Sequence, residues 1–241
     1  MNRFGLIGRN ISYSFSQTYF EEKFRNEGLK DCSYQIFDLN EIQEAEKLFE
    51  SADIKGLNVT IPYKQEIIRY LDKLSPEAEK IGAVNCVQIS NGIKTGYNTD
   101  VYGFELSLKN FILNQEIEAL LLGDGGAARA VRYVLDKLGI KNKTVSRKGN
   151  FSYAELNRYE IEKHSLVINC TPLGTFPAVE QYPEIPYGFL SSNHYLFDLI
   201  YNPAKTRFLE FGEKKGAKIK NGYEMLKLQA EKSWEIWQQF L

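Results

Sequence analysis

Hydrophobic positions along the chain form short apolar runs that alternate with stretches of helical periodicity. In residues 15–26, aromatic side chains recur on one face of a predicted helix, which Gly28 ends. The wholly apolar run at 119–122 is typical of a buried strand. Between two strand-like runs, the dipeptide Asn91-Gly92 predicts a tight hairpin.

The complete pattern predicts an α/β fold. Strands are expected at residues 3–8, 33–39, 56–61, 83–89, 94–97, 119–122, 143–147, 165–170, 196–200 and 218–220. Helices are expected at residues 15–26, 41–49, 63–71, 101–110, 127–138, 205–215 and 223–240. Because the pattern restarts after residue 113, we place a domain boundary in the helix near residues 101–113.

Composition narrows the class of protein. With 241 residues, 43% hydrophobic and 25% charged, the chain has ordinary globular composition and is long enough for one or two domains. This composition excludes a disordered chain, a collagen and a coiled coil. The net charge of -1 gives no electrostatic reason to expect nucleic acid or an anionic membrane as a partner.

The cysteine and histidine residues predict neither a disulfide framework nor a metal site. Three cysteines are widely spaced, and the two histidines lack the spacing of metal ligands. Together with an N-terminus unlike a signal peptide and the absence of a long apolar run, this indicates a cytoplasmic protein with reduced thiols.

The segment after residue 122 matches a dinucleotide-binding loop. Gly123-Asp124-Gly125-Gly126-Ala127-Ala128 joins a predicted strand to a predicted helix and fits G-x-G-x-x-A. Gly123 permits the tight turn, Gly125 allows the backbone to approach a pyrophosphate, and Ala128 allows close packing of helix on strand. The helix N-terminus would then bind the anion. A tight turn without a ligand is the alternative.

The next predicted strand indicates which dinucleotide binds. It ends in Arg147-Lys148, where a protein that prefers NAD usually carries an acidic residue. Two cations suit the 2′-phosphate of NADP, and arginine can also stack on adenine. The alternative is a solvated pair of charges at a strand end.

Polar residues also gather at predicted strand ends in the first half of the chain. Ser14 and Ser16 stand at a helix start, where one serine can serve as the N-cap. Lys64 falls in the first turn of the helix predicted at 63–71, where the helix dipole disfavours a cation, which is mild support for a functional lysine. Asn85 opens a strand, and Asp100 follows another. Strand ends are where α/β sheets bind ligands.

In these segments the chain resembles the shikimate dehydrogenase family. The matching motifs run in family order along the whole chain. They are the Ser14/Ser16 pair, Asn58-Val59-Thr60-x-Pro62-x-Lys64, Gly82-Ala83-Val84-Asn85, Gly96-Tyr97-Asn98-Thr99-Asp100-x-x-Gly103-Phe104, Gly123-x-Gly125-Gly126-Ala127, Asn169-Cys170-Thr171-Pro172-x-Gly174, Asp198-x-x-Tyr201-x-Pro203-x-x-Thr206 and Gly222-x-x-Met225-Leu226-x-x-Gln229.

The resemblance implies an N-terminal α/β substrate-binding domain and a C-terminal Rossmann domain for NADP, with a cleft between them. The first would cover residues 1–100, with the last helix, 223–241, packing back on it, and the second would cover residues 101–222.

The resemblance also implies reversible reduction of 3-dehydroshikimate to shikimate by NADPH, in a monomer or homodimer. Lys64 and Asp100 would be the catalytic pair. The implied substrate residues are Ser14, Ser16, Thr60, Asn85, Tyr201 and Gln229. The implied NADP residues are Gly123, Gly125, Gly126, Ala127, Arg147, Lys148, Thr171, Leu199 and Gly222.

Several positions depart from the family pattern. Tyr13 stands where relatives commonly have histidine, Gln17 where they have proline, and both Thr175 and Leu199 where they have methionine. No catalytic group is lost, but substrate preference stays open. A quinate/shikimate dehydrogenase that prefers NAD and a non-catalytic sensor of shikimate or NADP are the alternatives.

Overall fold

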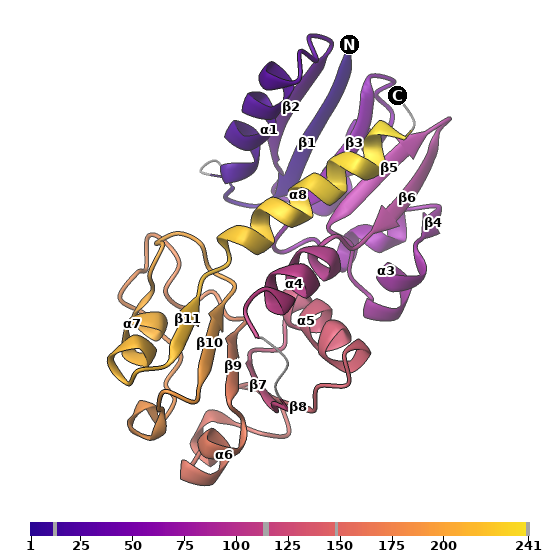
Figure 1. The fold of residues 1–241 in the computed structure, drawn as a ribbon. Coiled ribbons are helices and arrows are strands. Elements are labelled where there is room, and N and C mark those ends of the chain that lie inside the picture. The colour runs from indigo at the N-terminus through magenta and orange to yellow at the C-terminus, as the bar shows by residue number, and fades with distance from the viewer. Residues whose placement is uncertain (12–13, 113–115, 148, 240–241) are drawn as a thin grey trace. The chain divides into compact units, whose positions relative to one another are not determined.

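A computed structural model of the protein describes residues 1–11, 14–112, 116–147 and 149–239. The chain forms two compact units (Figure 1). Unit 1 contains Met1–Thr99 and the chain from Ala230 onward, and unit 2 contains Asp100–Gln229. The boundary near residue 230 falls inside the last helix, whereas the sequence analysis assigned that helix whole to the first domain. Each unit is built on its own sheet.

Unit 1 holds a six-stranded mixed sheet. Its strands are β1 (Asn2–Gly8), β2 (Cys32–Asp38), β3 (Ile54–Val59), β4 (Lys73–Leu74), β5 (Cys86–Ser90) and β6 (Ile93–Tyr97), in the order β2-β1-β3-β5-β6-β4. Its helices are α1 (Phe15–Asn26), α2 (Ala45–Phe49) and α3 (Pro76–Ile81), with the 3-10 helices η1 (Ile42–Glu44) and η2 (Glu66–Tyr70). β1 runs parallel to β2 and β3, whereas β5 runs antiparallel to β3 and β6.

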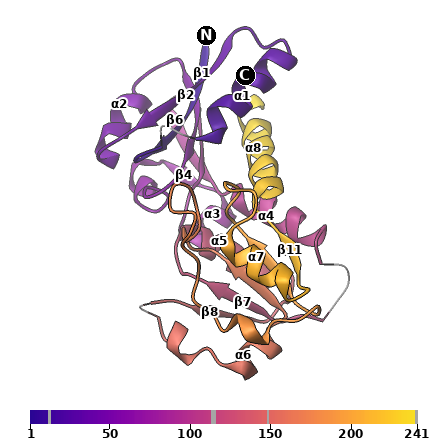
Figure 2. The same ribbon diagram turned by 90° about the vertical axis from the view of Figure 1, so that its left-hand side faces the viewer.

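Both faces of this sheet are covered. On one face, Phe20 and Phe24 of α1 pack with Trp234 and Trp237 of α8 (Tyr223–Gln238). The other face packs against α2, η2 and α3, and Figure 2 shows α2 opposite α1 and α8. The two tryptophans are only 4% and 1% exposed, so they belong to the core of unit 1.

The predicted hairpin is confirmed. Ser90 pairs with Ile93, so Asn91 and Gly92 form a two-residue loop. Both have positive φ, 51° and 78°, which is the conformation of a type I′ turn. Asparagine and glycine tolerate this conformation better than other residues, and this explains why the dipeptide was a reliable signal.

The helix predicted at 63–71 is wrong in its first half. Residues 61–65 form turns, and only Glu66–Tyr70 is helical, as the 3-10 helix η2. The Lys64 carbonyl accepts a hydrogen bond from the Val84 N–H at 2.7 Å, while the Ile68 N–H bonds to Gln65 instead. The Ile67 N–H still bonds to the Tyr63 carbonyl at 2.9 Å, but the next bond that would continue an α-helix is diverted to another segment. Because Lys64 precedes the helix, the dipole argument for it does not hold.

Unit 2 holds a five-stranded parallel sheet. Its strands are β7 (Ala119–Leu122), β8 (Asn142–Val145), β9 (Leu166–Asn169), β10 (Tyr195–Asp198) and β11 (Lys218–Lys220), in the order β11-β10-β9-β7-β8. Its further helices are α4 (Asp100–Lys109), α5 (Gly126–Lys137), α6 (Arg158–Lys163) and α7 (Arg207–Lys214), with the 3-10 helices η3 (Tyr153–Glu155) and η4 (Tyr187–Phe189). The chain turns from one direction across the sheet to the other between β7 and β9, which is the switch point where such sheets bind ligands.

Helices cover this second sheet on both faces, as is usual for a parallel sheet. Phe104 of α4 packs edge-on against Phe197 of β10, with ring centroids 5.2 Å apart. On the other face, Ile161 of α6 and Phe208 of α7 pack in one cluster with Leu120. Within the part of the chain that the structure describes, no helix is both long and apolar enough to cross a membrane.

Helices α3 and α6 are not among the helices expected from the sequence, and the single helix expected at 41–49 is divided into η1 and α2. α3 and α6 are six residues each, and α2 is five. Over so few residues the periodicity of apolar positions is not diagnostic. α3 nevertheless carries a clear start signal, because Ser75 caps it and Pro76 is its first residue.

Candidate active site

In unit 1, polar residues meet where β1 and β3 end and β5 begins. Thr60 directly follows β3, and its N–H bonds to the Ile7 carbonyl of β1 at 2.8 Å. The Asn85 carbonyl accepts from the Val59 N–H at 2.9 Å, which places Asn85 beside the end of β3. Antiparallel pairing of β3 with β5 produces this arrangement, since the end of one strand lies against the start of the other.

A chain of buried hydrogen bonds fixes these residues. Asn58 accepts from the Tyr34 hydroxyl at 2.9 Å and donates to the Ser233 hydroxyl at 2.9 Å. The Ser233 oxygen lies 3.2 Å from the Thr99 hydroxyl, which in turn contacts Asn85. Such a network is rigid, because hydrogen bonds between buried groups are stronger than those exposed to water and are costly to break.

The two serines differ in their surroundings. Ser14 is the N-cap of α1, and its hydroxyl accepts from the Ser16 N–H at 3.3 Å. Ser16 is 9% exposed and hydrogen-bonded to the hydroxyl of Tyr34, whose pKa is raised well above its ordinary value by burial. α1 therefore holds Ser16 next to the network of Asn58.

Lys64 and Thr60 belong to the same turn. The Tyr63 N–H bonds to the Thr60 carbonyl at 2.9 Å, and the Lys64 carbonyl binds Val84, the residue before Asn85. The side chain of Lys64 is partly exposed. Unit 1 thus brings together five predicted residues, which are Ser14, Ser16, Thr60, Lys64 and Asn85.

Unit 2 holds the remaining predicted residues. Asp100 is the first residue of α4 and is 6% exposed. Gln229 lies in α8, which packs closely against α4. A Cβ added to Gly103 of α4 would lie 3.1 Å from the Cβ of Gln229 and 2.5 Å from the carbonyl oxygen of Met225. Glycine is needed here because the two helices approach so closely. Tyr201 follows β10 and is half-buried.

The loop after β7 has the features that a pyrophosphate requires. Gly123 has a φ of 103°, which favours glycine. Gly125 is the N-cap of α5. Among the described residues no side chain caps this helix, and apart from the two chain neighbours no heavy atom lies within 4 Å of a Cβ built at Gly125. The N–H groups of the first turn, which Gly126 and Ala127 open, are thus available to an anion.

The end of β8 supplies the predicted cation. Arg147 is exposed two residues beyond β8, whereas Lys148 and also Tyr13 lie outside the described residues. Burial raises the pKa of Tyr153 to about 12, with the nearby Arg147 acting in the opposite direction and Asp124 and Cys170 adding to the rise. Tyr153 thus lies near the glycine-rich loop and the arginine, and the sequence analysis did not single it out.

The ends of β9 and β10 hold the last predicted cofactor residues. Thr171 comes two residues after β9 and lies against the glycine-rich loop. A Cβ added to Gly123 would be 3.0 Å from the Cγ2 of Thr171. Leu199 follows β10, and a Cβ on Gly222 would lie 2.0 Å from the Leu199 carbonyl oxygen. Glycine at 222 is therefore required by this approach.

Asn169 and Asp198 were quoted in the family motifs but given no role. Each is the fully buried last residue of an otherwise apolar strand, and the two are paired across β9 and β10. A polar residue that ends an apolar run is a signal that sequence reasoning can use.

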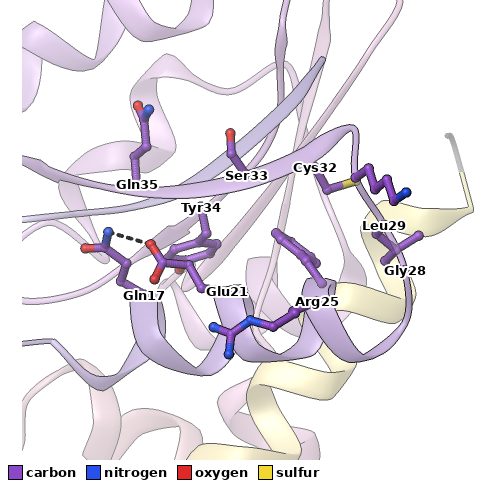
Figure 3. A pocket seen from close by; sticks show the side chains of 11 residues that line it. Gln17, Glu21, Arg25, Gly28, Leu29, Cys32, Ser33, Tyr34 and Gln35 are labelled. Atoms are coloured by element: carbon purple, nitrogen blue, oxygen red, sulfur yellow. Dashed lines mark hydrogen bonds between the residues drawn. The ribbon is translucent and has the colours of Figure 1, made fainter.

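A separate hollow of about 530 Å³ lies between α1 and β2 (Figure 3). Its lining includes Gln17, Glu21, Arg25 and Gln35, and none of the predicted substrate or cofactor residues lines it. We therefore assign it no part in the reaction. Among residues 1–11, 14–112, 116–147 and 149–239, no cluster of three His, Cys, Asp or Glu side chains could hold a metal ion.

Comparison with known proteins finds mainly shikimate dehydrogenases and, at 26% identity, a quinate dehydrogenase. The family model of the shikimate dehydrogenase substrate binding domain matches residues 6–87. Shikimate dehydrogenase (NADP(+)) of Clostridium beijerinckii is 41% identical, over 99% of this chain and 93% of the relative. The crystal structure of shikimate dehydrogenase from Aquifex aeolicus superposes with a TM-score of 0.90 at 34% identity, covering 99% of this chain and 93% of that one. Shikimate 5-dehydrogenase of Thermus thermophilus, in complex with NADP(H) and shikimate, gives 0.87 at 29% identity, covering 100% and 95%.

Proposed function

The chain belongs to the shikimate dehydrogenase family, and from that premise we propose which of its residues carry out the reaction. The protein is an NADP-dependent oxidoreductase that interconverts 3-dehydroshikimate and shikimate. The main support for NADP binding is the N-terminus of α5, which no described side chain caps. This helix follows β7 at the switch point of the sheet, and Gly123, with its positive φ, lies in the loop between them.

Gly123, Gly125, Gly126 and Ala127 would hold the pyrophosphate of NADP. Arg147 would bind the 2′-phosphate, because it is exposed and follows the strand adjacent to β7. Lys148 is its proposed companion. Thr171, Leu199 and Gly222 would contact the ribose and nicotinamide. When bound, NADPH supplies the hydride for the ketone.

Ser14, Ser16, Thr60, Asn85, Tyr201 and Gln229 would bind the substrate. Their hydroxyl and amide groups suit a small molecule with several hydroxyls and a carboxylate. A site of this kind discriminates strongly against analogues that lack a hydroxyl, because its own polar groups would then stay unpaired. The hydrogen-bond network of Asn58, Asn85 and Thr99 supports this proposal by holding the Asn85 side chain in one orientation.

Lys64 and Asp100 are the proposed catalytic pair. As the ketone is reduced, its oxygen gains negative charge and needs a proton, which the Lys64 ammonium donates. In the reverse direction the neutral amine accepts this proton. Asp100 accepts a hydrogen bond from the reacting hydroxyl and orients Lys64. Electrostatic stabilisation of the alkoxide by Lys64 is the second possible role of the same group.

The proposed reaction takes place in the cytoplasm, and the protein acts as a monomer or a homodimer. The three cysteines of the chain, Cys32, Cys86 and Cys170, are all free thiols, which supports a reducing compartment.

The direct test is absorbance at 340 nm, with the purified protein and shikimate, in parallel reactions with NADP and with NAD. A third reaction replaces shikimate with quinate. We expect rapid reduction with shikimate and NADP. Reduction only with NAD or with quinate would contradict the assigned specificity but keep the reaction type. Binding of NADP without any reduction would favour a sensor.

A further inference from the structure

Asp198 is an unusual residue for its place in the fold. It ends β10, whose other residues are Tyr195, Leu196 and Phe197, and it has no exposed surface. Burial raises the pKa of its carboxyl to about 7. A carboxyl in such a position costs free energy unless its oxygens are well hydrogen-bonded, so an apolar residue would be the simpler choice for packing alone.

Its two oxygens receive three hydrogen bonds from three different segments. Oδ1 accepts from the Asn169 side-chain amide at 3.1 Å and from the Ile200 N–H at 3.0 Å. Oδ2 accepts from the Thr206 hydroxyl at 2.5 Å. One side chain thus connects the end of β9, the segment after β10 and the N-cap of α7.

The first connection continues from Asn169 to Thr171. The Asn169 Oδ1 accepts from both the backbone N–H and the hydroxyl of Thr171, at 3.0 and 2.7 Å. Because Asn169 donates to Asp198 through its amide nitrogen, the carboxyl also fixes which way this amide is turned.

The second connection continues from Ile200 to Gly222. The Gly222 N–H bonds to the Ile200 carbonyl at 3.0 Å, and the Leu199 N–H bonds to the Asn169 carbonyl at 3.1 Å. Leu199 is therefore held between two residues that Asp198 itself binds.

We propose that Asp198 is a positioning residue for the reacting end of the cofactor. Through Asn169 and Ile200 it sets the backbone of Thr171, Leu199 and Gly222, and so the position that the nicotinamide would take against these residues. This inference rests on the proposed function, which assigns those three residues to the nicotinamide and its ribose. A displacement of about 1 Å in such an arrangement can reduce the rate by about a hundredfold.

The test uses two variants of the full-length protein. Asp198→Ala removes all three bonds at once. Asn169→Ala removes the connection to Thr171, together with a 3.4 Å bond to the Leu173 carbonyl, and leaves Asp198 bound to Ile200 and Thr206. It therefore keeps the proposal testable if Asp198→Ala does not fold. We measure kcat for reduction of 3-dehydroshikimate, the isotope effect on kcat with NADPH deuterated at the transferred position, and the Kd of adenosine 2′,5′-bisphosphate. That last probe carries the 2′-phosphate but no nicotinamide.

We expect kcat to fall by about ten- to a hundredfold, the isotope effect to rise, and the Kd of the probe to stay within about twofold of the wild-type value. The matched control is His194→Ala. His194 is 3% exposed and bonds to the Ile161 carbonyl at 3.0 Å, but it precedes β10 instead of following it. It should change none of the three quantities.

An unchanged kcat in Asn169→Ala would overturn the proposal. A parallel loss of kcat and of probe binding would also overturn it, since it would show a general structural role. Failure of the wild-type protein to reduce 3-dehydroshikimate would instead refute the proposed function, and this inference with it. That outcome is distinguishable because it is seen before any variant is made.

Discussion

The side chain of Asn85 is hydrogen-bonded to Thr99 at two points. Its Oδ1 accepts from the Thr99 N–H at 2.6 Å, and its Nδ2 donates to the Thr99 hydroxyl at 3.0 Å. Thr99 directly precedes Asp100 in the chain. One proposed substrate residue therefore fixes the backbone that leads into a proposed catalytic residue.

Asn85→Ala should lower kcat/KM for shikimate by about a hundredfold. It removes a proposed contact with the substrate, and it removes the buried hydrogen bonds between the Asn85 side chain and Thr99, a loss that costs about 1–3 kcal/mol. Steady-state kinetics measure the effect. Gln88→Ala is the matched control, because Gln88 is an amide equally buried in the same region, at 3% exposed. Equal losses in the two variants would contradict the assignment of Asn85.

Lys64→Ala should reduce kcat by about 10²- to 10⁴-fold, which is the usual contribution of a general acid. The Kd of NADPH, measured by fluorescence titration, should not change. Lys73→Ala serves as the control, because Lys73 is an exposed lysine of β4. If Lys64→Ala retains kcat within a few-fold of wild type, Lys64 does not donate the proton.

Arg147→Ala should weaken NADPH binding by about ten- to a hundredfold, since a hydrogen bond to a charged group contributes about 1.5–3 kcal/mol. NADH binding should change little, because NADH lacks the 2′-phosphate. Arg158→Ala, which removes another exposed arginine of the same unit, should affect neither. Equal losses for the two dinucleotides would show that Arg147 does not contact the 2′-phosphate.

The pH dependence of stability should carry the signature of Asp198. Its pKa is raised by burial from 3.8 to about 7. The folded protein therefore binds this proton more tightly than the unfolded chain does, and the contribution of Asp198 to the free energy of unfolding falls as pH rises from about 4 to about 7. Asp198→Asn cannot titrate.

Urea unfolding at pH 5 and pH 8 tests this. Relative to wild type, Asp198→Asn should be more stable at pH 8 than at pH 5. The same difference between the two proteins at both pH values would mean that the carboxyl is already ionised at pH 5.

Gly56→Ala should destabilise unit 1. A Cβ at Gly56 would stand 2.3 Å from the Trp237 Nε1, so the indole must move, and overpacking of this kind typically costs about 1–3 kcal/mol. The Trp237 N–H also bonds to the Val87 carbonyl at 3.0 Å, which limits its freedom to move. Urea unfolding followed by tryptophan fluorescence measures the loss. At Gly188 an added Cβ meets no described residue within 4 Å, so Gly188→Ala should leave stability unchanged.

Local signals in the sequence were sufficient for several elements. The helix at 15–26 and the strands at 119–122 and 218–220 have the predicted bounds. In each case the pattern of apolar residues, or a neighbouring glycine, determines the element locally. The α/β class and the glycine-rich loop could be predicted for the same reason.

What the sequence could not predict depends on contacts between distant segments. Lys64 lies in a turn because its carbonyl bonds to Val84, which is twenty residues away in sequence. The hydrogen bonds of Asp198 to Asn169 and Thr206 require three segments to meet, so the motifs contain these residues but do not reveal their partnership.

The division of unit 1 into two stretches affects the order in which the protein can fold during synthesis. Trp234 and Trp237 cover the face of the first sheet that carries Phe4 and Tyr34, yet the ribosome makes all of unit 2 before them. At about 5–20 residues per second, this delay lasts on the order of ten seconds. During that time α1 can pack on the aromatic face of a nascent unit 1 but Trp234 and Trp237 cannot, so the part of this face that they cover is a surface that chaperones can bind.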